Sequence, residues 1–291
     1  MIDGLRQALL DGRHAEAWRI YDQLREAGEP GPETHLLGGR AALARGDLHG
    51  ARTALERALE AGAAGEARGQ ALLVLGDVRR RLGEPIPAAA TLEEFLAGMD
   101  AEYPELGRHW RAAGLYNLGL TYRQLHRLEE AVAAYREAAA ESGLEALTDL
   151  QARSLWNLAW VLTLQGDTQR AREALAESEQ IRRDEWARWH QLIGWAFIEA
   201  VEGRTARVSE LTGRILRSET APADVRAHAC WLLGREALRM GDVQAAINLA
   251  DGGMAEALND LGDNRAYRDS VELWQEARRR QMEMADKAEG A

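Results

Sequence analysis

Apolar residues fall at the three- and four-residue spacings of an α-helix along most of this 291-residue chain. The clearest window is residues 115–122, which read Leu-x2-Leu-Gly-x2-Tyr and are followed by Ala131-x3-Tyr135 and Ala138. Ala, Leu, Glu and Arg dominate while β-branched residues are scarce, so local propensity favours helix nearly everywhere. The pattern predicts two helices joined by a short turn, and it predicts no β-strand.

The same hairpin pattern recurs along the chain, with a small residue five positions after each turn residue. Seven turns are predicted, 34 to 43 residues apart, at Gly12, Gly46, Gly83, His126, Gly166, Gly203 and Gly241. The alanines that follow them are Ala17, Ala51, Ala88, Ala131, Ala171 and Ala246. Glycine supplies the left-handed residue that ends the first helix, for which histidine is a poorer substitute. The small residue lets the second helix cross the first closely.

This arrangement resembles the tetratricopeptide repeat, a two-helix unit of about 34 residues with the pattern W-x2-L-G-x2-Y and then A-x3-F. Residues 115–138 carry it with Leu in place of the Trp and Tyr in place of the Phe. The resemblance covers roughly residues 2–260, and the longer units resemble the extended form of peptide-sensing and cargo-binding members. It implies an all-α fold: a right-handed superhelical solenoid of about seven units with a C-terminal capping helix.

The predicted organisation is a superhelix over residues 1–262, a capping helix over 263–284 and a flexible tail over 285–291. Tyr267, Val271 and Trp274 lie at helical spacing in the capping helix, which a solenoid needs to cover its last apolar face. Pro30 and Pro32 indicate the start of the second repeat. The sixth and seventh repeats depart most from the pattern, at Glu199, Val208, Thr212 and Ala250.

The resemblance also implies a binding surface, because one stripe of the first helix of each unit lines the concave groove in this family. A second stripe, rotated by roughly 100°, packs inside the hairpin instead. Following the groove stripe through the repeats gives a predicted peptide-binding site of sixteen residues: Arg40, Arg80, Arg81, Tyr116, Asn117, Leu120, Arg123, Gln124, Arg153, Trp156, Asn157, Trp160, His190, Phe197, Trp231 and Arg235. These side chains are predicted to face one continuous concave surface.

Arginine and aromatic side chains dominate the predicted site. Arginine offers a planar fork for carboxylates, and Trp and Tyr give a large contact area at little rotamer cost, so the site suits an acidic or carboxylate-bearing peptide. Asn117 and Asn157 fall at the register where peptide-binding relatives hold the ligand backbone, which an amide does by donating and accepting hydrogen bonds. Two alternatives stay open: Trp156 and Trp160 pack between repeats, or the two asparagines are simply solvated.

Composition argues against several other classes of function. The net charge of −11 argues against general affinity for nucleic acid or for an anionic membrane. The single cysteine, Cys230, has no second cysteine for a disulfide or a thiolate cluster, and we expect a buried helix residue in a reducing compartment. The sequence shows neither a leader pattern nor a membrane-spanning stretch, so a cytoplasmic location is expected.

Catalytic signatures are missing as well. The chain has no phosphate-binding loop, no dinucleotide motif, no zinc-protease motif and no nucleophile elbow, so no catalytic residue, metal or cofactor is expected. We expect a non-catalytic scaffold that binds a protein or peptide and is a monomer or a homodimer. The alternatives are a structural homo-oligomer, in which the groove is incidental, and a peptide-responsive regulator without its own DNA-binding domain.

Overall fold

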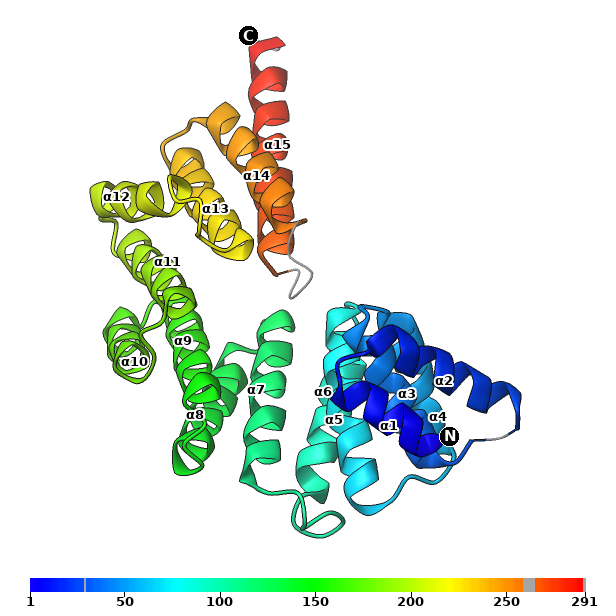
Figure 1. The fold of residues 1–291 in the computed structure, drawn as a ribbon. Helices are drawn as coiled ribbons and strands as arrows, with labels where there is room; N and C mark the ends of the chain where they lie inside the picture. Colours follow the sequence, from blue (N-terminus) through cyan, green and yellow to red (C-terminus); the bar gives the residue numbers. More distant parts are fainter. Residues whose placement is uncertain (29, 259–264, 290–291) are drawn as a thin grey trace. The chain divides into compact units, whose positions relative to one another are not determined.

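The computed structural model describes residues 1–28, 30–258 and 265–289, and in these ranges the chain forms fifteen α-helices and no β-strand (Figure 1). The expected all-α fold class is confirmed. In chain order the helices are α1 (Ile2–Leu10), α2 (His14–Glu26), α3 (Pro32–Ala44), α4 (Leu48–Glu60), α5 (Gly65–Arg81), α6 (Pro85–Gly98), α7 (Arg108–Gln124), α8 (Leu128–Leu144), α9 (Thr148–Leu164), α10 (Thr168–Ile181), α11 (Glu185–Val201), α12 (Thr205–Leu216), α13 (Ala223–Arg239), α14 (Val243–Ala257) and α15 (Arg265–Glu289).

All seven predicted turn residues hold a left-handed backbone between two helices. Their φ angles run from +56° at His126 to +85° at Gly241. Each turn separates the two helices of a pair, so α1 to α14 form seven hairpins within the described residues. A side chain with a Cβ is strained at such φ values, which explains why six of the seven positions are glycine. The predicted turn positions are confirmed, including those of the sixth and seventh repeats.

Several second helices begin with a capping aspartate directly after the turn glycine. The carboxylates of Asp47, Asp167 and Asp242 each accept a hydrogen bond from the backbone N–H three residues later. This bond satisfies one of the unpaired donors of the first helical turn. A Gly-Asp pair thus both ends one helix and starts the next.

The residue five positions after each turn is fully buried in every hairpin. Six are the predicted alanines and the seventh is Val208, and each has a relative exposure of 0%. Close approach is also visible at Gly119 of the motif on α7, where a Cβ would lie only 2.7 Å from the Cε1 atom of Tyr135 on α8. The two helices of a hairpin therefore cross where small side chains leave room for the facing helix.

Residue contacts divide the chain into two compact units, Met1–Ser154 and Leu155–Ala291, with the boundary inside α9. In unit 1 the first helices of successive hairpins, α3, α5 and α7, contact one another. In unit 2, α11 contacts the first helix of the next hairpin, α13, and α13 contacts the last helix, α15. Since the predicted site residues lie on the first helices of the hairpins, each unit carries a candidate face of its own.

Helix α15 packs against α13 and α14, as expected of a capping helix, with Leu273 and Ala277 buried. The helix continues to Glu289, whereas the sequence-based boundary ended it at residue 284. Residues 285–289 read Ala-Asp-Lys-Ala-Glu, and these mostly helix-favouring residues continue the helix, with the side chains of residues 285–287 exposed. The predicted boundary at 262–263 and the last two residues of the predicted tail, 290–291, lie outside the described residues.

Candidate functional site

Unit 1 carries nine of the sixteen predicted site residues, on α3, α5, α7 and the start of α9, and we call this surface the unit 1 face. Two of the nine, Arg40 and Arg153, are exposed. Three are half-buried: Arg81, Asn117 and Gln124. The other four are buried: Arg80, Tyr116, Leu120 and Arg123. The unit 1 face is therefore a mixture of packed and accessible side chains.

The two predicted site arginines of α5, Arg80 and Arg81, form ion pairs with an aspartate of the same helix. The Nη2 atom of Arg80 lies 2.7 Å from Oδ1 of Asp77, and Nη1 of Arg81 lies 3.9 Å from Oδ2 of the same carboxylate. Asp77 precedes the arginines by three and four residues, so the pairs join adjacent turns of the helix. The Asp77 carboxylate therefore binds Arg80 closely and lies at the edge of ion-pair distance from Arg81.

Helix α7 supplies amide groups to the unit 1 face. The Nε2 atom of Gln124 is buried and has no hydrogen-bond partner among the described residues. Asn117 precedes Gln124 by about two helical turns, so both amides lie on the same side of α7. Beside them the guanidinium carbon of Arg153 lies 5.4 Å from the centre of the Tyr116 ring. The face thus offers amides and a stacked cation to a ligand.

In unit 2 the predicted site residues form an aromatic cluster, which we call the unit 2 face. The ring centre of Trp160 lies 4.6 Å from that of Phe197, 5.4 Å from that of Trp156 and 6.0 Å from that of Trp231. Trp160 is 3% exposed and Phe197 is 1% exposed. Only Arg235 is exposed, with its guanidinium carbon 5.0 Å from the Trp231 ring centre. Most of this face is packed inside unit 2. The burial of Trp160 agrees with the alternative in which the tryptophans pack between repeats.

His190 and Asp224 form a polar pair beside the aromatic cluster. The Nε2 atom of His190 lies 2.9 Å from Oδ2 of Asp224, and its Nδ1 atom lies 2.9 Å from the carbonyl oxygen of Trp186. The indole N–H of Trp156 donates to the carbonyl oxygen of His190 at 2.6 Å. Burial tends to raise the pKa of Asp224, but the hydrogen bond and charge of His190 outweigh it, so the pKa lies below its usual value.

The last helix places a guanidinium group on the unit 2 face. Arg265, the first residue of α15, is 8% exposed. Its guanidinium carbon lies 4.5 Å from the ring centre of Trp160 and 5.1 Å from that of Trp156. Sequence reasoning did not find this residue, because its position at the start of the last helix has no feature that links it to α9.

Two polar atoms complete the surroundings of Arg265. Its Nε donates to Nε2 of His228 at 3.1 Å, and its Nη1 lies 3.5 Å from Oδ1 of Asn157. The Nδ1 atom of His228 lies 2.8 Å from the carbonyl oxygen of Asp224, to which it donates, so Nε2 is left as the acceptor. We call Trp156, Asn157, Trp160 and His228 the Arg265 cage. Since Asn117 and Asn157 belong to different units, their shared concave surface stays a prediction.

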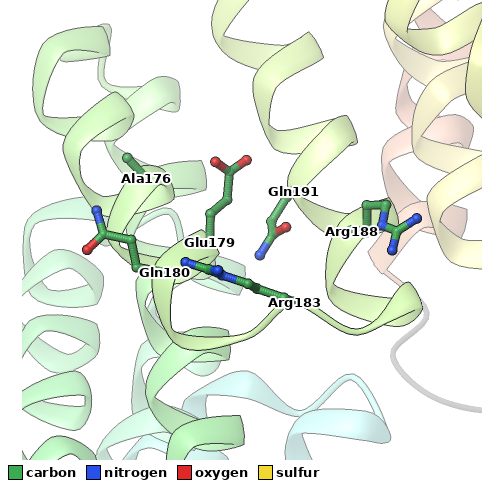
Figure 2. Close-up of a pocket in the computed structure, with 6 residues that line it drawn as sticks. All are labelled: Ala176, Glu179, Gln180, Arg183, Arg188 and Gln191. Atoms are coloured by element: carbon green, nitrogen blue, oxygen red, sulfur yellow. The ribbon is translucent and has the colours of Figure 1, made fainter.

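A surface pocket of about 510 Å³ opens where α10 ends and α11 begins (Figure 2). It is lined by Ala176, Glu179, Gln180, Arg183, Arg188 and Gln191. Glu179 accepts a hydrogen bond from the Trp195 indole at 2.5 Å, and Gln191 donates to the carbonyl oxygen of Arg182 at 3.0 Å. None of the lining residues belongs to the predicted site, because they lie at the junction of two repeats and not on the groove stripe.

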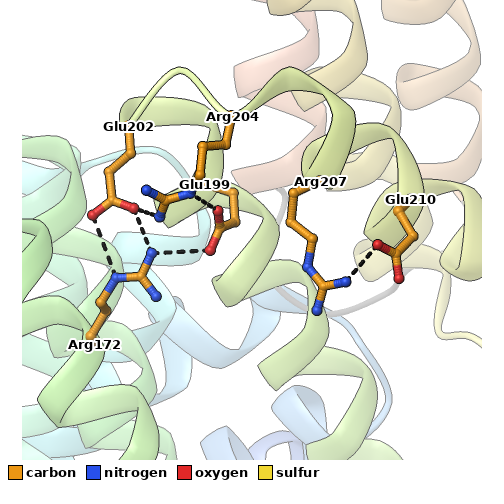
Figure 3. Close-up of polar contacts among 6 residues, drawn as sticks. All are labelled: Arg172, Glu199, Glu202, Arg204, Arg207 and Glu210. Atoms are coloured by element: carbon orange, nitrogen blue, oxygen red, sulfur yellow. Dashed lines mark hydrogen bonds and ion pairs between the residues drawn. The ribbon is translucent and has the colours of Figure 1, made fainter.

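A network of ion pairs joins α10, α11 and the turn after α11 (Figure 3). The Nη2 atom of Arg172 lies 3.0 Å from Glu199 and 2.5 Å from Glu202, and Arg204 binds the same two carboxylates. Glu199 is buried. Burial raises its pKa, but hydrogen bonds from Arg204 and Arg172 lower it by more, so the net pKa is lowered. The paired arginines allow a carboxylate to replace an apolar residue in the sixth repeat.

The described residues contain no group of three or more His, Cys, Asp and Glu side chains that could hold a metal ion. Cys230 is buried, as expected, and burial raises the pKa of its thiol to about 11. In the part of the chain that the structure describes, no helix is both long and apolar enough to cross a membrane. What the two faces offer is stacking, hydrogen bonding and charge.

Two family models, both described as tetratricopeptide repeat, match residues 36–104 and 110–184. No curated protein matches the chain. Among solved structures, the apo form of RapI aligns with a TM-score of 0.61 and 15% identity, covering 91% of this chain and 92% of RapI. A tetratricopeptide repeat protein from Parabacteroides merdae aligns with a TM-score of 0.56 and 16% identity, covering 84% of this chain and 98% of that protein.

A third similar structure is YrrB, described as a TPR protein with an unusual peptide-binding site. It aligns with a TM-score of 0.50 and 18% identity, covering 64% of this chain and 87% of YrrB. At these identities the likeness concerns the fold. Together with the seven left-handed turns, it shows an all-α solenoid of helical hairpins.

Proposed function

Because this chain is a tetratricopeptide repeat protein, we propose that it acts as a non-catalytic scaffold that holds an extended segment of another polypeptide. Proteins of this family are generally interaction scaffolds, and the similar structure of YrrB is described as containing a peptide-binding site. We place the contact on the unit 1 face, where five of the nine predicted residues remain exposed or half-buried. The proposal includes a cytoplasmic location.

The observation that carries the proposal is the buried Nε2 atom of Gln124, which lacks an acceptor among the described residues. A buried donor without an acceptor costs about 1–3 kcal/mol. The side chain of Gln124 as a whole is half-buried, so a rotation that turns its amide outward lets a ligand supply the acceptor and removes that cost. An extended peptide offers a carbonyl oxygen at every residue. Asn117, on the same side of α7, can donate to one peptide group and accept from another.

The exposed arginines suggest the character of the segment that is held. Arg40 and Arg153 are accessible on α3 and α9, and guanidinium groups form their strongest hydrogen bonds with carboxylates. We therefore propose an acidic or carboxylate-bearing segment as the ligand of the unit 1 face. Its main chain is held by the amides and its acidic side chains by the arginines.

The test is affinity capture from a lysate of the native host by the wild-type protein and by an Asn117→Ala/Gln124→Ala/Arg153→Ala variant. A matched control is Arg136→Ala, which removes an exposed arginine from α8, a second helix of its hairpin. We expect the wild type and the control to retain a partner that the triple variant loses, with equal helicity and melting for all three. A partner that the triple variant retains in full would contradict the proposal, as would a wild type that captures none.

A further inference from the structure

The guanidinium group of Arg265 lies in a cage that other helices of unit 2 build. Trp156, Asn157 and Trp160 come from α9, and His228 comes from α13. We propose that this cage is a binding site for an arginine side chain of a partner polypeptide, and that Arg265 occupies it when the partner is absent. The inference rests on the proposed function, since it requires that the chain holds another polypeptide.

The chemistry of the cage selects a planar cation. Two indole rings face the guanidinium carbon at 4.5 and 5.1 Å, within the range at which an aromatic ring attracts a cation. Two atoms within hydrogen-bond distance of the guanidinium, Nε2 of His228 and Oδ1 of Asn157, are acceptors. A carboxylate at the same place would face electron-rich rings and lone pairs. The cage therefore favours arginine and disfavours an acidic side chain.

Two carboxylates near the cage lie beside histidine side chains. Oδ2 of Asp269 lies 3.7 Å from Nε2 of His228, while Oδ2 of Asp224 pairs with His190. The guanidinium of Arg265 is held by two rings and two hydrogen-bond acceptors, and the arginine of a partner can make the same contacts.

Arg265 is also poorly placed within its own helix. It is the first residue of α15, where the positive end of the helix dipole disfavours a cation, and the first turn of α15 has no acidic residue. The rest of α15 is anchored elsewhere: Leu273 and Ala277 are buried, and a Cβ at Gly234 would lie 2.5 Å from a methyl carbon of Leu273. Ala266 in the first turn is also buried, so the backbone of α15 stays docked and only the side chain of Arg265 has to rotate out of the cage.

The test compares the wild type with Arg265→Ala in titrations with the capped peptide Gly-Gly-Arg-Gly-Gly, followed by tryptophan fluorescence. Trp156 and Trp160, which line the cage, report its occupancy. Removal of the internal occupant raises the fraction of open sites, so we expect the Kd to fall by about tenfold or more. Peptides with Lys or Glu in place of Arg are expected to bind more weakly, with Glu the weakest.

Two further variants make the result specific to the cage. Adding Asn157→Leu to Arg265→Ala removes an acceptor from the open cage and is expected to weaken binding of the Arg peptide. Arg279→Ala removes an exposed arginine from the same helix and is expected to bind like the wild type. Where Arg265→Ala lowers helicity or melting temperature, Arg265→Gln replaces it, because the amide keeps hydrogen-bond donors while losing the charge.

The proposal is overturned if neither opened variant binds the Arg peptide more tightly than the wild type, or if the Glu peptide binds as well as the Arg peptide. Its outcome is separate from that of the partner capture. The capture experiment changes only residues of unit 1, whereas these titrations use a short peptide and substitutions in unit 2. A negative result in the partner capture therefore does not affect the peptide titrations, and a negative titration does not affect the capture.

Discussion

The unit 1 face and the unit 2 face carry the same stripe of the repeat but present it in opposite ways. On the unit 1 face polar residues such as Asn117, Gln124 and Arg153 remain partly or fully accessible. On the unit 2 face Trp160 and Phe197 are enclosed, and α15 adds a guanidinium to them. The repeat register thus determines which side of a helix a residue occupies, while the neighbouring elements determine whether that side is surface or core.

The largest expected effect tests this difference directly. Phe197→Ala should lower the free energy of unfolding by about 3–5 kcal/mol, because it removes a 1% exposed ring from the core of unit 2. Asn117→Ala, at the corresponding stripe of unit 1, should change it by less than about 0.5 kcal/mol. Denaturation in guanidinium chloride measures both. Equal and small losses would place Phe197 on an open surface and remove the contrast between the faces.

A second substitution tests how unit 2 accommodates the buried carboxylate of Glu199. Arg172→Ala should cost about 1–2 kcal/mol, because it withdraws one of the two arginines that pair with the buried Glu199. The matched control is Arg207→Ala, whose pair with Glu210 is half exposed on both sides (Figure 3) and should contribute about 0–0.5 kcal/mol. Chemical denaturation of the two variants gives the difference. A loss for Arg172→Ala no larger than that for the control would contradict the structural role of the network.

Two turn residues, one in each unit, can be substituted in opposite directions: histidine to glycine in unit 1 and glycine to alanine in unit 2. His126→Gly should raise the free energy of unfolding by about 1 kcal/mol, because φ is +56° at His126 and a Cβ is strained there. Gly166→Ala should lower it by about the same amount, since φ is +81° at Gly166 and no atom within 4 Å would crowd the new methyl group. Thermal and chemical unfolding should move in opposite directions for the two variants. If both substitutions changed the free energy of unfolding in the same direction, backbone strain at the turns would not determine stability.

The smallest effect is a change in acid sensitivity. The pKa of Asp224 is lowered in the folded chain, so its contribution to stability is fully present above the unfolded pKa, near 4, and is lost as the pH falls through the folded pKa. In Asp224→Asn the free energy of unfolding should therefore fall less steeply below about pH 4. Glu130→Gln in unit 1 removes a partly exposed carboxylate with a lowered pKa, and salt should reduce its effect. An unchanged slope in Asp224→Asn would show that the carboxyl is not coupled to folding.

Much of the fold could be predicted from sequence because its causes are local. A turn glycine and the alanine five residues later are requirements within one hairpin, so their recurrence identified all seven turns and six of the seven fully buried crossing residues. Val208 and Glu199 break the pattern and are accommodated by neighbours, Glu199 by arginines outside its own helix. The structure continues α15 to Glu289, past the predicted end at residue 284, because helix propensity continues there while the apolar periodicity used for the prediction has ended.

The sequence predicted on which side of its helix each site residue lies, but not whether that side is buried. The stripe that holds Trp156 and Trp160 follows from helical periodicity. Its enclosure depends on Arg265, which is separated from Asn157 by 108 positions in the chain. No local pattern encodes such a contact, since it arises only when α15 docks on α13 and α14. The same limit applies to the pocket of Figure 2, which is formed by two helices of different repeats.

Every residue of the Arg265 cage precedes Arg265 in the chain, and this order matters during synthesis. The ribosome releases α9 and α13 before α15, and chains begin to fold from the N-terminal side as they emerge. A nascent chain therefore passes through a stage in which the cage can form before its own arginine has been delivered. A partner that meets the chain at this stage competes with nothing, so the timing of translation as well as affinity decides which arginine enters first.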